Sequence, residues 1–90
     1  MTYEEISKIS ENTFNKRRAI DSLREELEAV DLYHQRADAT KDETLKKIMI
    51  HNANEEKEHA AMLIEWLRRN DKDFEKELKE YLFSDKEINH

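Results

Sequence analysis

Residues 45–67 read LKKIMIHNANEEKEHAAMLIEWL, and this stretch decides the fold because its apolar residues recur at the three- and four-residue spacing of a helix. The stripe is apolar at both ends, where it contains Leu45, Ile48, Met49, Leu63, Trp66 and Leu67. Its middle is polar and contains Asn52, Glu56 and His59. A buried polar group without a partner costs roughly 1–3 kcal/mol, and an unpaired charge costs more. A metal ion is therefore the expected partner of Glu56 and His59.

The composition indicates an all-α protein with a single domain over residues 1–90. The chain has no Gly, Pro or Cys, so it lacks the residues that usually mark turns and has no thiolate for a metal site or a disulfide. Charged residues make up 42% and apolar residues 37%, a balance that is common in long exposed helices and coiled coils. Any metal ligands must be carboxylates or imidazoles.

The net charge of −6 narrows the range of partners. It disfavours nucleic acids and anionic membranes, and it suits a cationic partner or substrate such as Fe²⁺. No apolar run approaches the length of a membrane span, and the first residues have no signal-peptide pattern. The sequence therefore predicts a cytoplasmic protein that binds neither nucleic acid nor membrane.

Three helices are expected. Thr2 and Glu5 have the spacing of a capping box, which predicts a first helix over about residues 3–38. The best turn lies at residues 38–42, with Thr40 or Asp42 as the cap of a second helix that runs to about residue 70. Asp71 can cap a short third helix that ends near residue 83.

The two long helices must form an antiparallel hairpin because the turn between them is short. Such a hairpin cannot enclose a core by itself, and a second copy would complete a four-helix bundle. In two-metal carboxylate bundles, two helices each supply one Glu and the other two each supply a Glu-x-x-His pair. One copy of this chain offers half of that set, so we expect a ferritin-like half-bundle that dimerises.

The Glu expected from the first helix is Glu26. It lies among the apolar residues Leu23, Leu27 and Val30, at the same depth from the turn as Glu56. Glu26, Glu56 and His59 would form a half-site, and two copies would supply four carboxylates and two imidazoles. This set suits iron or manganese and could also hold zinc.

Simpler interpretations compete with this one. The chain contains a second Glu-x-x-His pair, Glu87 and His90, without an apolar frame, so the motif alone is weak and the pair at Glu56 could belong to a solvated face. Glu25 and Glu28 could gather cations at an acidic mouth or simply face solvent. Tyr33 could hydrogen-bond a ligand carboxylate or pack in the core.

Several stretches resemble the encapsulated ferritins. They are EELEAVD at 25–31, Tyr33, QRAD at 35–38, HN at 51–52 and EEKEHA at 55–60, with further similarity at 65–66, 68–69 and 81–83. The resemblance covers most of the chain and is far more specific than a lone Glu-x-x-His motif.

The resemblance implies a ferroxidase, which oxidises Fe(II) to Fe(III) at a di-iron site between two subunits. Glu26, Glu56 and His59 would be the iron ligands, and Glu25 and Glu28 would form an outer site that can also take other divalent cations. The hairpins would pair into dimers and the dimers into a ring-shaped decamer, which would deliver iron for mineral storage inside an encapsulin nanocompartment. The shell protein would be the partner and the cytoplasm the location.

The chain departs from that family at two places. Leu32 stands where relatives often carry Trp, and the chain ends at His90 without the tail that directs such proteins to a shell. The alternative function is a helical assembly or adaptor protein, either stapled by a metal or free of metal, that performs no catalysis.

Overall fold

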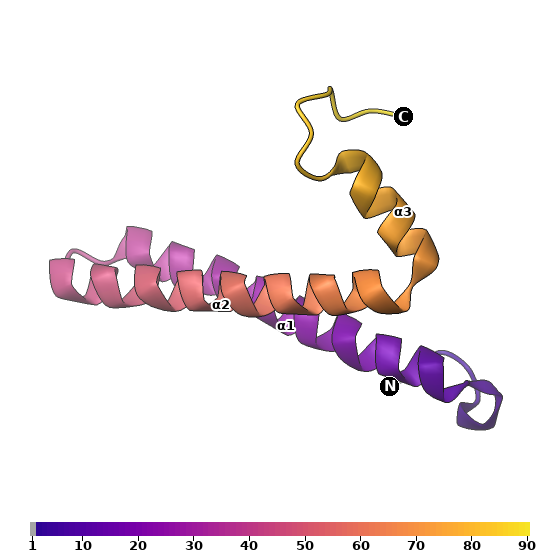
Figure 1. The fold of residues 1–90 in the computed structure, drawn as a ribbon. Coiled ribbons are helices and arrows are strands. Elements are labelled where there is room, and N and C mark those ends of the chain that lie inside the picture. Colours follow the sequence, from indigo (N-terminus) through magenta and orange to yellow (C-terminus); the bar gives the residue numbers. More distant parts are fainter. Residues whose placement is uncertain (1) are drawn as a thin grey trace.

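The computed structural model describes residues 2–90, and its architecture is all-α. In chain order, a 3₁₀ helix η1 (Ile6–Lys8) precedes the helices α1 (Glu11–Ala39), α2 (Glu43–Asn70) and α3 (Lys72–Tyr81), and no residue of this range lies in a strand. Helices α1 and α2 form a long antiparallel hairpin, and α3 turns away from it (Figure 1). The molecule is elongated, with extents of 50 × 37 × 20 Å. This confirms the predicted fold class.

A three-residue connection closes the hairpin, as the sequence predicts. The Asp42 carboxylate accepts a hydrogen bond from the backbone N–H of Leu45 at 3.0 Å and so caps α2. Thr40, the other candidate, instead accepts a hydrogen bond from the N–H of Asp42 at 3.2 Å. Thr40 therefore stabilises the turn after α1, and Asp42 caps the beginning of α2.

The predicted beginning of the first helix was wrong. Helix α1 begins at Glu11, because Ser10 has an extended backbone and its hydroxyl accepts a hydrogen bond from the N–H of Thr13 at 3.2 Å. Thr2 does not cap a helix, and its hydroxyl donates to the carbonyl of Glu4 at 2.9 Å. Tyr3 and Ile6 are largely exposed, so an earlier helix would have no apolar surface to pack against.

The third helix begins where predicted and ends slightly earlier. Asp71 alone joins α2 to α3, and its carboxylate accepts hydrogen bonds from the N–H groups of Asp73 and Phe74 at 3.1 and 3.0 Å. Helix α3 ends at Tyr81 because Phe83 has a positive φ of 55°, the left-handed conformation that commonly follows a helix.

Most of the buried residues of the hairpin are alanines. The buried apolar residues in the described range are Ala19, Ala37, Ala53, Ala60 and Leu67. Many larger apolar side chains stay exposed, among them Ile20, Leu27, Leu45, Ile48 and Met62. No helix in residues 2–90 is long and apolar enough to cross a membrane.

Candidate metal centre

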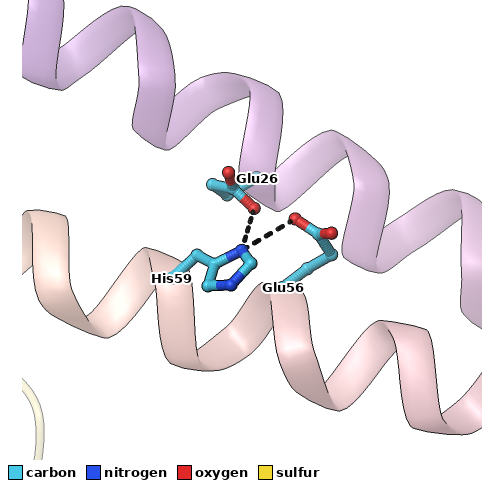
Figure 2. Close-up of side chains that lie close together, drawn as sticks. All are labelled: Glu26, Glu56 and His59. Atoms are coloured by element: carbon cyan, nitrogen blue, oxygen red, sulfur yellow. Dashed lines mark ion pairs between the residues drawn. The ribbon is translucent and has the colours of Figure 1, made fainter.

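Glu26, Glu56 and His59 meet between the two long helices. Glu26 projects from the middle of α1 toward α2, where Glu56 and His59 lie one helical turn apart (Figure 2). Each of the three side chains offers one ligand atom, and these atoms all lie within 4.8 Å of one another. We call these three residues the central cluster.

The register of the hairpin brings the cluster together. Glu26 lies 14 residues before Thr40 and Glu56 lies 14 residues after Asp42, since 40 − 26 and 56 − 42 are equal. Equal numbers of residues at the same rise per residue place the two glutamates at one level of an antiparallel pair. His59 follows Glu56 by three residues, so it shares the face of α2 that meets α1.

One imidazole nitrogen faces both carboxylates. Nδ1 of His59 lies 3.4 Å from Oε2 of Glu26 and 3.6 Å from Oε2 of Glu56 (Figure 2). The shorter of these contacts has the length of an ion pair but not the geometry of a hydrogen bond. Oε2 of Glu26 is shielded from solvent and also has no hydrogen-bond partner. An oxygen in that position is suited to accept a cation.

The cluster is partly open to solvent. The exposed fraction of the side chain is 23% for Glu26 and 24% for Glu56, but 48% for His59. Two carboxylates held between helices, with a half-exposed imidazole beside them, leave room for further ligands from outside the chain. Carboxylate oxygens with imidazole nitrogen suit iron, manganese or zinc.

The structure does not bring Glu25 and Glu28 into the central cluster. Both are exposed residues of α1 and, at about 100° per residue, they point to other sides of the helix than Glu26. Their mutual spacing of three residues places them on a common face of α1. They form an exposed acidic pair beside the cluster.

Tyr33 lies two helical turns beyond Glu26, on the same side of α1. It is half-buried, and the guanidinium of Arg36 lies over its ring at 5.8 Å. Within residues 2–90 no hydrogen bond joins its hydroxyl to a carboxylate of the central cluster. A contribution of Tyr33 to metal binding stays a prediction.

Reasoning from the sequence overlooked the small residues that surround the cluster. Ala53 and Ala60, one turn before and one turn after Glu56, are fully or almost fully buried. The signal was present in the sequence as alanine at positions where a helical stripe usually carries leucine.

An antiparallel helical hairpin with two glutamates and a histidine between its helices defines an all-helical protein with a candidate carboxylate metal centre. Comparison with known proteins shows the family: the chain belongs to the EncFtn-like family, whose model matches residues 1–85.

Two relatives are similar over nearly the whole chain. An encapsulated ferritin-like protein of Rhodospirillum rubrum is 54% identical over 84 residues, which are 93% of this chain and 60% of that protein. A ferritin-like protein of Thermotoga maritima is 52% identical over 86 residues, 96% of this chain and 75% of that protein. The chain thus spans less than two thirds of the length of the R. rubrum relative.

A crystal structure supports the fold. A protein from Nitrosomonas europaea superposes with a TM-score of 0.92 at 60% sequence identity, covering 99% of this chain and 98% of the other. Family membership and this likeness agree with the resemblance that the sequence indicated.

Proposed function

We propose that the protein is a ferroxidase that oxidises Fe(II) to Fe(III) at a two-iron site formed between two copies of the chain. The observation that carries the proposal is the central cluster, in which three ligand atoms from two helices lie within 4.8 Å. Membership of the EncFtn-like family supports iron as the metal.

The ligand count favours a site shared by two copies. One chain supplies two carboxylates and one imidazole, which are half of the ligands found in the two-metal carboxylate bundles. Two copies would bring four carboxylates, whose four negative charges balance two Fe²⁺ ions. The half-exposed side of His59 is compatible with such completion by a second chain.

Each residue of the cluster would have a defined role. Glu26 and Glu56 would bind the Fe²⁺ substrates with their carboxylate oxygens and place them close together. His59 would supply a neutral nitrogen ligand, which binds iron without adding negative charge. Each Fe²⁺ would give up one electron, and O₂ would take up both electrons together with two protons to form H₂O₂.

The surroundings of the site suit a cationic substrate. The exposed pair Glu25 and Glu28 would gather Fe²⁺, and could hold other divalent cations, before transfer to the cluster. The net charge of −6 acts in the same direction. Tyr33, two helical turns from Glu26 on the same side of α1, would hydrogen-bond a ligand carboxylate in the completed site.

We extend the proposal to the assembly and its setting. The hairpins would pair into dimers and the dimers into a ring-shaped decamer. The R. rubrum relative is named as encapsulated, and on that basis an encapsulin shell would be the partner, with the oxidised iron stored as mineral inside it.

Stopped-flow measurement of Fe(II) oxidation in air tests the proposal. We expect Glu26→Ala and His59→Ala to lower the initial rate by at least about tenfold, because each removes a ligand. His51→Ala is the matched control, since His51 is an exposed histidine of the same helix that pairs with Glu55 instead. Equal rates in all four proteins would refute the ferroxidase function. Metal binding without oxidation by the wild type would favour the alternative, a metal-stapled assembly protein.

A further inference from the structure

Small side chains frame the central cluster on both helices. They lie one helical turn to either side of each glutamate: Ser22 and Ala29 around Glu26 on α1, and Ala53 and Ala60 around Glu56 on α2. The positions of this frame also correspond across the hairpin: in the register that sets Glu26 level with Glu56, Ser22 is level with Ala60 and Ala29 with Ala53. Each small residue of one helix therefore lies at the level of a small residue of the other.

The two alanines of α2 in this frame are among the most buried residues of the described chain. Ala53 is 0% exposed and Ala60 is 5% exposed, whereas Leu27, next to Glu26 in the sequence, is 54% exposed. The axes of packed helices lie about 8–10 Å apart, and the side chains at the contact decide where in that range a pair falls. Methyl groups at the contact bring α1 close to α2 at the level of the cluster.

The close approach has a direct consequence for the three ligands. Glu56 and His59 belong to one helix, so their mutual distance does not depend on the neighbouring helix. Glu26 comes from the other helix, and its shielded Oε2 reaches within 3.4 Å of Nδ1 of His59. A larger side chain in the frame would move α1 outward and take Glu26 away from the pair on α2.

We propose that Ala53 and Ala60 are positioning residues that set the spacing between α1 and α2 at which Glu26 joins Glu56 and His59 as a metal ligand. The inference rests on the proposed function, because it assumes that the cluster binds a metal. It adds that the side-chain volume at these two positions determines the affinity of the cluster for the metal, although neither alanine contacts the metal.

A series at one position separates spacing from stability. Ala60→Gly and Ala60→Ser keep the contact small, while Ala60→Val and Ala60→Leu enlarge it. The Gly variant separates stability from spacing, because glycine weakens α2 without pushing α1 away. Ala61→Leu is the matched control, since Ala61 is the adjacent alanine of α2 and is exposed.

Co²⁺ is the probe, because its visible absorption reports the ligand set and its titration gives an affinity without turnover. We expect the Val and Leu variants to bind Co²⁺ at least about tenfold more weakly, on the ~10–100-fold scale on which misplaced ligand surroundings lower metal affinity. The Gly, Ser and Ala61→Leu proteins should bind as the wild type does, although Gly should lower the melting temperature.

The outcomes that overturn the inference are distinct. If affinity follows melting temperature, so that Gly weakens binding as Leu does, the alanines are structural only. If the Leu variant binds Co²⁺ as tightly as the wild type, spacing is irrelevant while the metal site itself stands. If the wild type binds no Co²⁺ through the cluster, the proposed function fails and the inference fails with it. Ala53→Val repeats the test should Ala60→Leu lose its helical circular dichroism.

Discussion

Glu26 carries a shielded oxygen that no hydrogen bond satisfies. Such an atom lowers the stability of the metal-free protein and raises its affinity for a cation. Glu26→Gln should therefore change the stability of the metal-free protein and the metal affinity in opposite directions. The amide can donate a hydrogen bond to a neighbouring carboxylate, which is worth about 0.5–1.5 kcal/mol, and about 1 kcal/mol raises the melting temperature by roughly 4–8 °C in a small protein. Metal affinity should fall, because the amide is uncharged.

Thermal melting of the metal-free proteins at pH 8, above the range in which histidine side chains usually titrate, checks this expectation. Glu58→Gln is the control, because Glu58 is an exposed glutamate of α2 next to the cluster in sequence. It should change neither the melting temperature nor the affinity for Co²⁺. A melting temperature lowered by Glu26→Gln would show that the carboxylate stabilises the metal-free fold.

At the level of single residues, helical phase and depth from the turn together predict the three members of the cluster. Both place Glu26 on the inward face at the level of Glu56, and in the structure Glu26 lies against Glu56 and His59. Phase could not predict the shielding of one oxygen of Glu26, because that depends on how closely the two helices approach. Nor could it distinguish a half-buried Tyr33 under Arg36 from a tyrosine bonded to a ligand.

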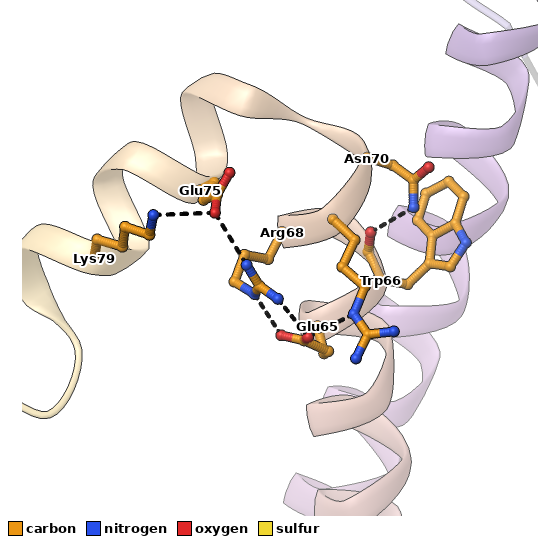
Figure 3. Close-up of polar contacts among 7 residues, drawn as sticks. Glu65, Trp66, Arg68, Asn70, Glu75 and Lys79 are labelled. Carbon is orange, nitrogen blue, oxygen red and sulfur yellow. Dashed lines mark hydrogen bonds and ion pairs between the residues drawn. The ribbon is translucent and has the colours of Figure 1, made fainter.

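The elbow between α2 and α3 is held by a network of charged side chains, which we call the elbow network: Glu65, Arg68, Arg69, Glu75 and Lys79. Arg68 donates two hydrogen bonds to Glu65, at 2.6 and 2.7 Å, and a third to Glu75 of α3 at 3.1 Å (Figure 3). Arg69 also donates to Glu65, at 2.7 Å, and Lys79 pairs with Glu75 at 3.2 Å. Arg68 therefore couples the two helices.

The elbow network should be sensitive to acid. The hydrogen bonds from Arg68, and after them those from Arg69, lower the pKa of Glu65 from 4.5 to about 2. A carboxylate whose pKa is lowered by folding stabilises the fold above its unfolded pKa, and this contribution is lost as the pH falls through the folded value. We expect the last turn of α2, which presents Arg68 to Glu75, to loosen between about pH 4.5 and 2. The backbone amide signals of residues 65–70 in NMR spectra measure this.

Glu65→Gln should remove most of that transition, because the charge that holds Arg68 and Arg69 is lost. A smaller acid effect should remain, because the hydrogen bond from the N–H of Phe74 also lowers the pKa of Asp71, the cap of α3. Glu58→Gln again serves as the control and should keep the wild-type profile. An unchanged pH dependence in Glu65→Gln would mean that the hydrogen bonds of Glu65 do not stabilise the end of α2.

Among the elements, helix starts are predictable where the candidate caps lie close together or only one exists. The sequence offers Thr40 or Asp42 for α2 and Asp71 for α3, and in the structure Asp42 and Asp71 accept the expected backbone hydrogen bonds. The first helix was misplaced because Thr2 and Ser10 can both cap, and only Ser10 precedes residues that pack against α2. Local sequence does not contain that information, since it depends on the partner helix.

As a whole molecule, the chain is an extended hairpin that buries few large side chains. The short turn allowed the antiparallel arrangement to be predicted, and the four buried alanines explain why the hairpin is thin. The apolar side chains left exposed on the long helices include Ile20, Leu27, Leu32, Leu45, Ile48, Ile50 and Met62. A surface of this kind favours association with further copies of the chain.

Metal binding and assembly should therefore depend on each other. In the proposed dimer without metal, the carboxylates of the two half-sites would repel each other and so oppose the pairing of hairpins. A divalent cation removes this repulsion, and a ligand that binds only the assembled form stabilises it by about 2.7 kcal/mol at 100 times its dissociation constant. We expect anaerobic addition of Fe²⁺ to move the population from single hairpins to dimers and larger rings. Native mass spectrometry measures this shift.

Two variants determine whether the shift arises at the central cluster. His59→Ala removes one ligand from each half-site and should abolish the response to Fe²⁺. His51→Ala removes an exposed histidine of the same helix and should respond as the wild type does. The same distribution of oligomers with and without Fe²⁺ in the wild type would contradict the coupling. If Fe²⁺ still shifts the oligomers of His59→Ala, the metal that drives assembly binds at another site. Glu25 and Glu28 would then be the next residues to substitute.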